Sequence, residues 1–373
     1  MFKQYKLKDY RFRLIAYVVI LCIIGIFVIG SAKESVQDKQ IIGLIGGLIL
    51  MVIVSLIDYS TILKFRRPIY LLSIVLLAAV LKLGVNRGGA TRWILVGGIQ
   101  FQPSEICKIF LIIFFSAFFM KYREKLNTWK ILVISIILIG IPLALIESEP
   151  DLSTMIITAL IFITLLFIAG LSYKIVLGVL AVGIPTGIIG IILIFKRALP
   201  LQDYQYKRIL SWLDPMHYAD EARQQQNSIM AIGSGQLWGK GLNNNSIASM
   251  KNGDFIPEPQ TDFIFTIVGE ELGFVGCLIV IILLLLIVFE CILVAKNAKD
   301  LGGRLICSGM AALIGFQSFV NICVTTGLMP NTGLPLPFVS YGLTSLMSLF
   351  IGIGLVLNVG LQARKYGTGD IES

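Results

Sequence analysis

Apolar runs of close to twenty residues recur along the chain and are separated by shorter polar segments. Such a run crosses a bilayer as a helix, because about 20 residues rising about 1.5 Å each span roughly 30 Å of hydrocarbon. The short alternating segments of a transmembrane barrel are absent. The pattern predicts an all-α, polytopic membrane protein in which residues 1–373 form one domain. The ten predicted spans are 14–30, 41–58, 68–85, 105–120, 129–146, 152–170, 174–195, 263–289, 305–326 and 338–360.

Basic residues are distributed unequally between the segments that connect these spans. The N-terminus, the loops after spans two, four, six and eight, and the C-terminal tail hold eighteen, whereas the short segments on the other side hold five. By the positive-inside rule, both chain ends are cytoplasmic. The eighteen are Lys3, Lys6, Lys8, Arg11, Arg13, Lys64, Arg66, Arg67, Lys121, Arg123, Lys125, Lys130, Lys174, Lys296, Lys299, Arg304, Arg364 and Lys365, and the five are Lys33, Lys39, Lys82, Arg87 and Arg92.

The amino-acid composition excludes some classes of protein and some kinds of metal site. The chain is 56% hydrophobic and 14% charged, with a mean hydropathy of +0.86, which excludes an ordinary soluble protein. The net charge of +9 follows from topology and does not indicate nucleic acid. The six cysteines lie singly in apolar segments, without metal-ligand spacing, so we interpret them as small buried hydrophobic side chains. His217 is the only histidine, which excludes a multi-histidine zinc site.

One long loop, at about residues 196–261, falls on the extracytoplasmic side. Within it, the aromatic and aliphatic residues of 204–215 predict a short helix lying in the headgroup layer. A loop of this length is usually functional or disordered, and this one is too apolar for disorder. Glycines in the stretch 228–242 would allow backbone amides to approach an anionic group, but their spacing is not that of a phosphate-binding loop.

Asp262 follows this loop and opens the long apolar helix that carries Glu270 and Glu271. A carboxylate at the mouth of a membrane helix is costly to keep, so a functional role is the first interpretation. The alternative is an N-terminal helix cap, since aspartate accepts hydrogen bonds from free backbone amides. Thr261 is equally able to cap.

Two more polar sites lie at the predicted outer face. Glu105 and Lys108 are three residues apart inside the outer end of a span, so they share one helix face. They are either a structural pair whose charges neutralise one another or functional groups. Arg92 precedes Trp93 and is either an interfacial anchor or a phosphate contact. In the turn 147–152, three acids are either solvated loop charge or, for Asp151, a helix cap or a site residue.

A proline-rich and glycine-rich segment, 327–342, ends the ninth span on the same side. Three prolines and three glycines prescribe a non-helical backbone beside the membrane. Such a backbone is tolerated where it is buried in protein or lines a cavity. All the unusual chemistry therefore converges on the outer face, and the cytoplasmic loops contain nothing comparable.

The chain resembles the SEDS family (shape, elongation, division and sporulation), whose members include RodA, FtsW and SpoVE. The resemblance covers the whole chain in order, and the short N-terminus and tail are more similar to the RodA branch. Its departures are mild: Gly342–Ser345 in place of Gly-Gly-Ser-Ser, Asn227 in place of glutamine, and Gln236 where glycine is common. The stretches that carry it are Arg92-Trp93, Phe101–Glu105 with Lys108, Pro150–Leu152, Arg208-Ile209, Asp214-Pro215, Ala231–Gly235, Gly239–Gly241, Phe255–Glu258, Thr261–Phe265, Glu270–Gly273 and Gly333–Gly342.

The resemblance implies a peptidoglycan glycosyltransferase of the bacterial cytoplasmic membrane, which polymerises lipid II at the outer face and serves cell-wall elongation and cell shape. It implies a class B penicillin-binding protein as partner. Asp262 falls on the family's essential aspartate. Glu105, Lys108, Arg92 and Asp151 fall on other positions on which the family relies, and Glu258 and Ser340 lie in matched stretches; we expect these six to bind substrate.

The chemistry of the reaction suggests roles for several of the expected site residues. A lipid diphosphate is a good leaving group, so the reaction needs a base at the acceptor 4-hydroxyl and positive charge at the phosphates. Asp262 is the expected base. Arg92, Lys108, Arg208 and Lys240 are the expected diphosphate contacts. A divalent cation, Mg²⁺ or Mn²⁺, on Asp262 or Asp151 is an arrangement that these residues allow. The alternatives are a lipid II flippase and a non-enzymatic scaffold for a penicillin-binding protein.

Overall fold

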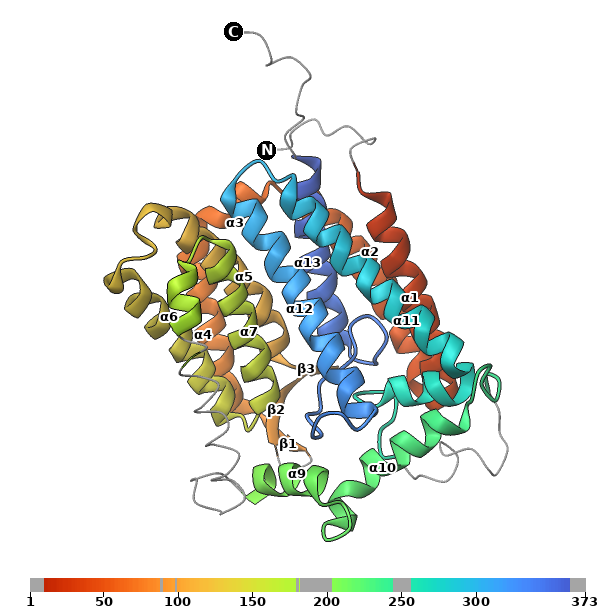
Figure 1. The fold of residues 1–373 in the computed structure, drawn as a ribbon. Coiled ribbons are helices and arrows are strands. Elements are labelled where there is room, and N and C mark those ends of the chain that lie inside the picture. The colour runs from red at the N-terminus through yellow and green to blue at the C-terminus, as the bar shows by residue number, and fades with distance from the viewer. Residues whose placement is uncertain are drawn as a thin grey trace.

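The computed structural model describes residues 10–87, 90–97, 99–178, 181, 203–243 and 256–362. Within these residues, seven helices are long and apolar enough to cross a membrane, and Leu152–Ile168 is a shorter apolar helix. The polytopic helical fold is confirmed (Figure 1). The helices are α1 (Phe12–Ala32), α2 (Gln37–Leu56), α3 (Tyr59–Lys64), α4 (Arg66–Leu83), α5 (Pro103–Lys121), α6 (Trp129–Ser148), α7 (Leu152–Ile168), α9 (Asp203–Leu213), α10 (Ala219–Ser234), α11 (Ile264–Lys296), α12 (Leu301–Thr325) and α13 (Leu343–Leu361), with 3₁₀ turns η2 (Glu34–Val36) and η3 (Arg123–Lys125).

Nine of the ten predicted spans coincide with helices of the bundle, and most of the tenth, 174–195, lies outside the described residues. The first helix begins on the side of the bundle where the last helix ends, as predicted for two chain ends on one side of the membrane. A Cβ at Gly360, near the end of α13, would lie 3.3 Å from Cγ of Arg11, which precedes α1. Figure 1 shows the start of α1 and the end of α13 at the top of the bundle.

Helix α12 lies at the centre of the bundle, in contact with α5, α7, α11 and α13 (Figure 1). Helices α2 and α13 form another close pair, and glycine permits that approach. A Cβ on Gly47 would lie 2.1 Å from the ring of Phe350, so any larger side chain would separate the two helices. Close packing of small residues is the usual source of helix association in lipid. The six cysteines are all buried and unpaired with one another, as predicted.

A small sheet, which the sequence analysis did not predict, covers the outer ends of α4 and α5. Its strands β1 (Val85–Arg87), β2 (Ala90–Val96) and β3 (Ile99–Phe101) are antiparallel in the order β1-β2-β3. Strand β2 contacts α4 and α5, and β3 contacts α13. The sheet fixes the position of Arg92, which is on the middle strand.

Helices α9 and α10 belong to the long predicted loop and lie at the opposite end of the bundle from the chain termini (Figure 1). The short helix predicted in 204–215 is present as α9. It packs against protein on one side: Tyr206 and Leu210 are buried, and Trp212 Nε1 donates to the Gly327 carbonyl at 2.8 Å. His217, in the connection to α10, is exposed.

Helix α11 is broken at Gly273, whose φ of 66° is left-handed. The chain of 235–241 docks at the break, where Phe274 N–H donates to the Gln236 carbonyl at 2.8 Å and Val275 N–H to the Leu237 carbonyl at 3.2 Å. A Cβ at Gly273 would lie 2.3 Å from the nitrogen of Gly239, so only glycine fits. Gln236 has a φ of 51°, which explains why glycine suits its position. The break joins the long loop to the bundle.

Candidate active site

Asp262 lies two residues before α11, at the end of the molecule that carries α9, α10 and the sheet. Its carboxylate accepts a hydrogen bond from the Thr261 hydroxyl at 3.0 Å. It does not cap the helix, because the N-cap of α11 is Phe263 and no side chain caps that end. The alternative that Asp262 is a helix cap is therefore wrong, and capping does not explain why a carboxylate lies at this position.

Asn321 holds the backbone beside Asp262. The Asn321 amide on α12 donates to the main-chain carbonyls of Asp262 and Leu334, each at 2.7 Å. Gly333, beside Leu334, has a φ of 72°, and a Cβ there would lie 3.5 Å from Asp262 Oδ2. The loop 327–342 thus passes directly against the carboxylate, as expected for a non-helical segment that lines a polar site.

Burial raises the pKa of Asp262 above its ordinary value of 3.8. The hydrogen bond from Thr261 opposes this shift, as do the positive charges of Arg208 and Arg92. A raised pKa moves a carboxylate closer to neutrality and makes it a better proton acceptor than an exposed aspartate. The two arginines share the electrostatic environment of Asp262, so α9 and β2 contribute to one site.

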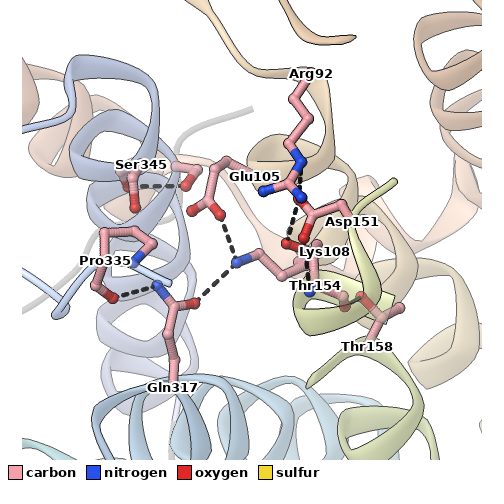
Figure 2. A network of polar contacts seen from close by, with 10 residues as sticks. Arg92, Glu105, Lys108, Asp151, Thr154, Thr158, Gln317, Pro335 and Ser345 are labelled. Atoms are coloured by element: carbon pink, nitrogen blue, oxygen red, sulfur yellow. Dashed lines mark hydrogen bonds and ion pairs between the residues drawn. The ribbon is translucent and has the colours of Figure 1, made fainter. Parts of the chain in front are cut away.

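Arg92 extends from the middle strand onto the N-terminus of α7. Its Nη2 donates to the Pro150 carbonyl, and its Nε lies 3.7 Å from Asp151 Oδ2 (Figure 2). Asp151 caps α7, with Oδ1 accepting from the Thr154 N–H at 3.1 Å and Oδ2 from the Thr154 hydroxyl at 2.9 Å. Asp151 therefore acts as a helix cap that also orients Arg92.

Glu105 and Lys108 form a fully buried pair on α5. Lys108 Nζ donates to Glu105 Oε1 at 2.7 Å and to Gln317 Oε1 at 2.8 Å (Figure 2). Gln317 on α12 in turn donates to the Pro335 carbonyl at 2.9 Å. The chain of contacts ties α5 and α12 to the loop 327–342. Both side chains of the pair are at most 3% exposed, so the geometry favours positioning of this loop over direct contact with substrate.

The loop 327–342 is fixed at further points. Ser153 Oγ on α7 donates to the Thr332 carbonyl at 2.6 Å. Ser340 Oγ accepts from the Leu336 N–H at 2.7 Å and closes a turn within the loop. Ser340 is 6% exposed, so its hydroxyl stabilises the turn in this structure. Its expected contact with substrate stays a prediction.

Two other expected substrate-binding residues form ion pairs. Lys240 Nζ donates to Glu270 Oε1 at 2.8 Å, and Lys33 Nζ lies 3.1 Å from Glu258 Oε1. The glycine-containing stretch around Lys240 packs on the first turns of α11, because the amides of Lys240 and Gly241 donate to the carbonyls of Glu270 and Glu271, each at 3.0 Å. Those amides are engaged and do not cradle an anion.

Gln317 and Asn321 were missed by the sequence analysis. They lie four residues apart in α12, and Thr325 follows after four more, so the three share one helix face. A polar stripe at this spacing on an apolar span is a detectable signal. The role of these polar side chains could not be predicted from the stripe alone, because it depends on the loop 327–342 folding back onto that helix face.

Glu149 was named only as one of three acids in a turn, yet it is 0% exposed. Neither of its carboxyl oxygens has a hydrogen-bond partner among the described residues. Burial, followed by repulsion from Asp151, raises its pKa to about 8, while Arg92 opposes the shift. Glu149 is therefore a buried, largely protonated acid beside Arg92.

The described residues supply no ready-made metal site, since no three His, Cys, Asp or Glu side chains gather among them. Both carboxylate oxygens of Asp151 accept hydrogen bonds from Thr154. An ion on Asp262 would take most of its ligands from substrate phosphates. The described residues therefore do not fit a protein-held ion.

Known proteins resemble this chain over almost its full length. The FTSW_RODA_SPOVE family, described as "Cell cycle protein", matches residues 12–365. "Peptidoglycan glycosyltransferase MrdB" of Escherichia coli (strain K12) is 34% identical, over 91% of this chain and 90% of its own length. "Probable peptidoglycan glycosyltransferase FtsW" of Geobacter sp. (strain M18) is 32% identical, over 96% and 99%.

Solved structures agree with these relatives. A chain from "Structural coordination of polymerization and crosslinking by a peptidoglycan synthase complex" superposes with a TM-score of 0.77 and 29% identity, over 94% of this chain and 97% of its own. The rod shape determining protein RodA of Thermus thermophilus superposes with a TM-score of 0.69 and 26% identity, over 95% and 98%.

We predict that Lys108→Met costs more stability than the double variant Glu105→Gln/Lys108→Met. The single change leaves a carboxylate buried without its cation, a loss of about 3–5 kcal/mol, whereas the double change removes both charges. Melting temperatures in detergent test this. A double variant at least as unstable as the single variant would show that the pair does not act as a neutralising unit.

We predict that Glu149→Gln stabilises the protein increasingly as pH rises. A pKa of about 8 in the fold, against 4.5 for the ordinary side chain, means that the wild type loses stability as pH rises from about 4.5 to about 8. Glutamine has no proton to lose. The difference in melting temperature between variant and wild type should be smallest near pH 5 and largest near pH 9. A difference independent of pH would contradict the assignment.

Proposed function

The chain belongs to the FtsW/RodA/SpoVE family, and we propose that it is a peptidoglycan glycosyltransferase that polymerises lipid II into glycan strands at the outer face of the cytoplasmic membrane. Relatives of this family bear the name peptidoglycan glycosyltransferase. The observation that carries the proposal is a carboxylate, Asp262, with a raised pKa and no capping role, beside two arginines at one end of the bundle.

The proposed reaction is a single displacement. The acceptor 4-hydroxyl gives its proton to the Asp262 carboxylate, and its oxygen forms the new bond to C1 of the donor sugar. The bond between C1 and the lipid diphosphate breaks, and the diphosphate leaves with the bonding electrons. Attack opposite the leaving group converts an α-linked donor into a β-linked glycan. Because the diphosphate leaves readily, the step requires a base and stabilisation of the departing charge rather than a general acid.

Arg208 and Arg92 are the proposed cations for the departing diphosphate. Both exert a positive potential at Asp262, which supports assigning them to the negative charge that develops next to the proposed base. Guanidinium groups bind phosphate oxygens in pairs, which fixes orientation as well as charge. Arg92 is held by Pro150 and Asp151, and its direction is set before substrate arrives. Preorganised charge of this kind stabilises a transition state without a cost of reorganisation.

The remaining polar residues act on these groups indirectly. Asn321, Gln317, Lys108 and Glu105 fix the loop that packs against Asp262. We assign them as positioning residues. A shift of about 1 Å in a reacting group is costly to the rate, so their loss is expected to lower turnover although they touch no substrate.

A flippase is the less favoured alternative. Transport across the membrane requires polar contacts along a route between the two faces. The central helix α12 buries only apolar residues, glycine and cysteine between Gly302 and Ile314, and polar buried residues begin at Gln317. The polar side chains that α12 buries are thus confined to its outer half, which suits a reaction at one face.

A class B penicillin-binding protein is the proposed partner, because a similar chain occurs in a peptidoglycan synthase complex that couples polymerisation to crosslinking. We further propose a role in elongation and cell shape, as for the RodA protein that this chain resembles in structure. Relatives named FtsW are also similar, so the penicillin-binding protein that co-purifies with the chain distinguishes elongation from division.

We predict that Asp262→Asn abolishes polymerisation of labelled lipid II by the purified protein in detergent, with an unchanged melting temperature. Asparagine keeps the shape of the side chain but cannot accept the hydroxyl proton. Asp220→Asn, an exposed acid in the first turn of α10, is the matched control and should polymerise normally. Glycan of normal length and rate from Asp262→Asn would remove Asp262 from the base role. A wild type that makes no glycan alone or with its penicillin-binding protein would favour the scaffold.

A further inference from the structure

A second polar region lies at the other end of the bundle, where α11 turns into α12 (Figure 1). A cavity of about 210 Å³ opens there between this turn and the residues after α5. Four cations line it: Arg123 of η3, Lys296 at the end of α11, Lys299 in the turn, and Arg304 in the first turn of α12. The sequence analysis expected nothing comparable to the outer chemistry on this side, so the cavity is a feature that it missed.

Among the described residues, one acid, Asp300, lines the cavity, and its hydrogen bonds go to groups other than these cations. Asp300 Oδ1 accepts from the Gly303 N–H at 2.8 Å and caps α12, while Oδ2 accepts from the Tyr59 hydroxyl at 2.9 Å. Lys299 is engaged as well, since its ammonium donates to Gln362 and lies 4.8 Å from the centre of the Tyr59 ring. Asp300 keeps its negative charge, so four cations face one carboxylate among the described residues that line the cavity.

The side chains of Arg123, Lys296 and Arg304 form no hydrogen bond or ion pair within the described part of the chain, although their backbone groups do. They come from two connections far apart in sequence, yet the fold brings them around one cavity. Gathering like charges costs free energy unless an anion joins them. Loops with basic residues are ordinary at a cytoplasmic face, but Arg66 and Arg67 at the start of α4 satisfy that rule without lining this cavity.

We propose that this cavity binds a phosphate group. Its location at the ends of α5, α11 and α12 is the level at which acidic lipid headgroups meet the cytoplasmic ends of helices, and basic pockets between such helices bind acidic headgroups. Two arginines offer paired donors to phosphate oxygens, and lysine adds a point charge. The phosphate belongs either to an acidic phospholipid or to a soluble phosphate compound, which share this chemistry. The proposal is independent of the glycosyltransferase reaction at the outer face.

The test measures ligand binding to the purified full-length protein, in which the cavity is intact. The probes are phosphatidylglycerol, phosphatidylcholine as the zwitterionic control with no net charge, and inorganic pyrophosphate, each followed by native mass spectrometry and by melting temperature. The variant is Arg123→Gln/Lys296→Gln/Arg304→Gln. The matched control is Arg66→Gln/Arg67→Gln/Lys130→Gln, which removes three cations from the same side outside the cavity.

We expect phosphatidylglycerol to bind the wild type and the control variant in preference to phosphatidylcholine, and the cavity variant to lose roughly a hundredfold in apparent affinity. Binding of pyrophosphate without a preference for phosphatidylglycerol, lost in the same variant, would support the proposal with a soluble ligand. Equal binding by the two triple variants, or no binding of either phosphate probe by the wild type, would overturn it. If the triple variant does not fold, Arg304→Gln alone should weaken binding several-fold while Arg66→Gln does not.

Discussion

The side-chain amide of Asn321 donates to the carbonyls of Asp262 and Leu334, and these two bonds join the segment with the proposed base to the loop beside it. The outer end of this protein contains non-helical backbone next to the membrane, where unpaired carbonyls are costly. Side chains supply the missing donors: Gln317 for Pro335, Ser153 for Thr332, and Gln225 for Val324 and Met329. The same side chains thus provide hydrogen bonds to the non-helical backbone and hold the candidate site in place.

The electrostatics of the site follow from the same packing. Burial desolvates Asp262 and raises the pKa of its carboxyl group, whereas the positive charges of Arg208 and Arg92 lower this pKa and so limit the rise. Lys108 and Glu105 neutralise one another in the interior, so they add no net field but fix the loop through Gln317. Glu149 avoids adding a second negative charge near Arg92 by remaining largely protonated below its pKa of about 8.

Much of the fold could be predicted from the sequence, because the length of an apolar run is a local property. Helix ends were less certain: the span predicted from residue 338 begins at Leu343, since the prolines before it keep the backbone non-helical. The sheet was missed because its two outer strands have only three residues each and no long alternating pattern. The glycine stretch 235–241 was interpreted as a potential anion cradle because its true partner, the break at Gly273, is remote in sequence.

The sequence allowed us to predict which residues belong to the candidate site better than it allowed us to predict what each residue does there. Asp262, Arg208 and Arg92 could be named from the cost of charge near a membrane and from motif resemblance, and the structure brings them into one electrostatic environment. Burial decides the rest. Whether Glu149 is solvated or Lys108 is exposed depends on contacts between distant segments, and the function of Asn321 depends on a loop that folds back along its own helix.

The pH dependence of lipid II polymerisation by the wild type and by Arg208→Gln, measured with the same purified preparations, tests most directly whether the desolvated Asp262 carboxylate is the base. Activity should fall with decreasing pH through a midpoint above 3.8, the ordinary pKa of aspartate. In Arg208→Gln this midpoint should move to higher pH, because a positive charge that lowers the pKa of Asp262 is gone. A midpoint at the ordinary value, or one that does not move when Arg208 is neutralised, would contradict this role for Asp262.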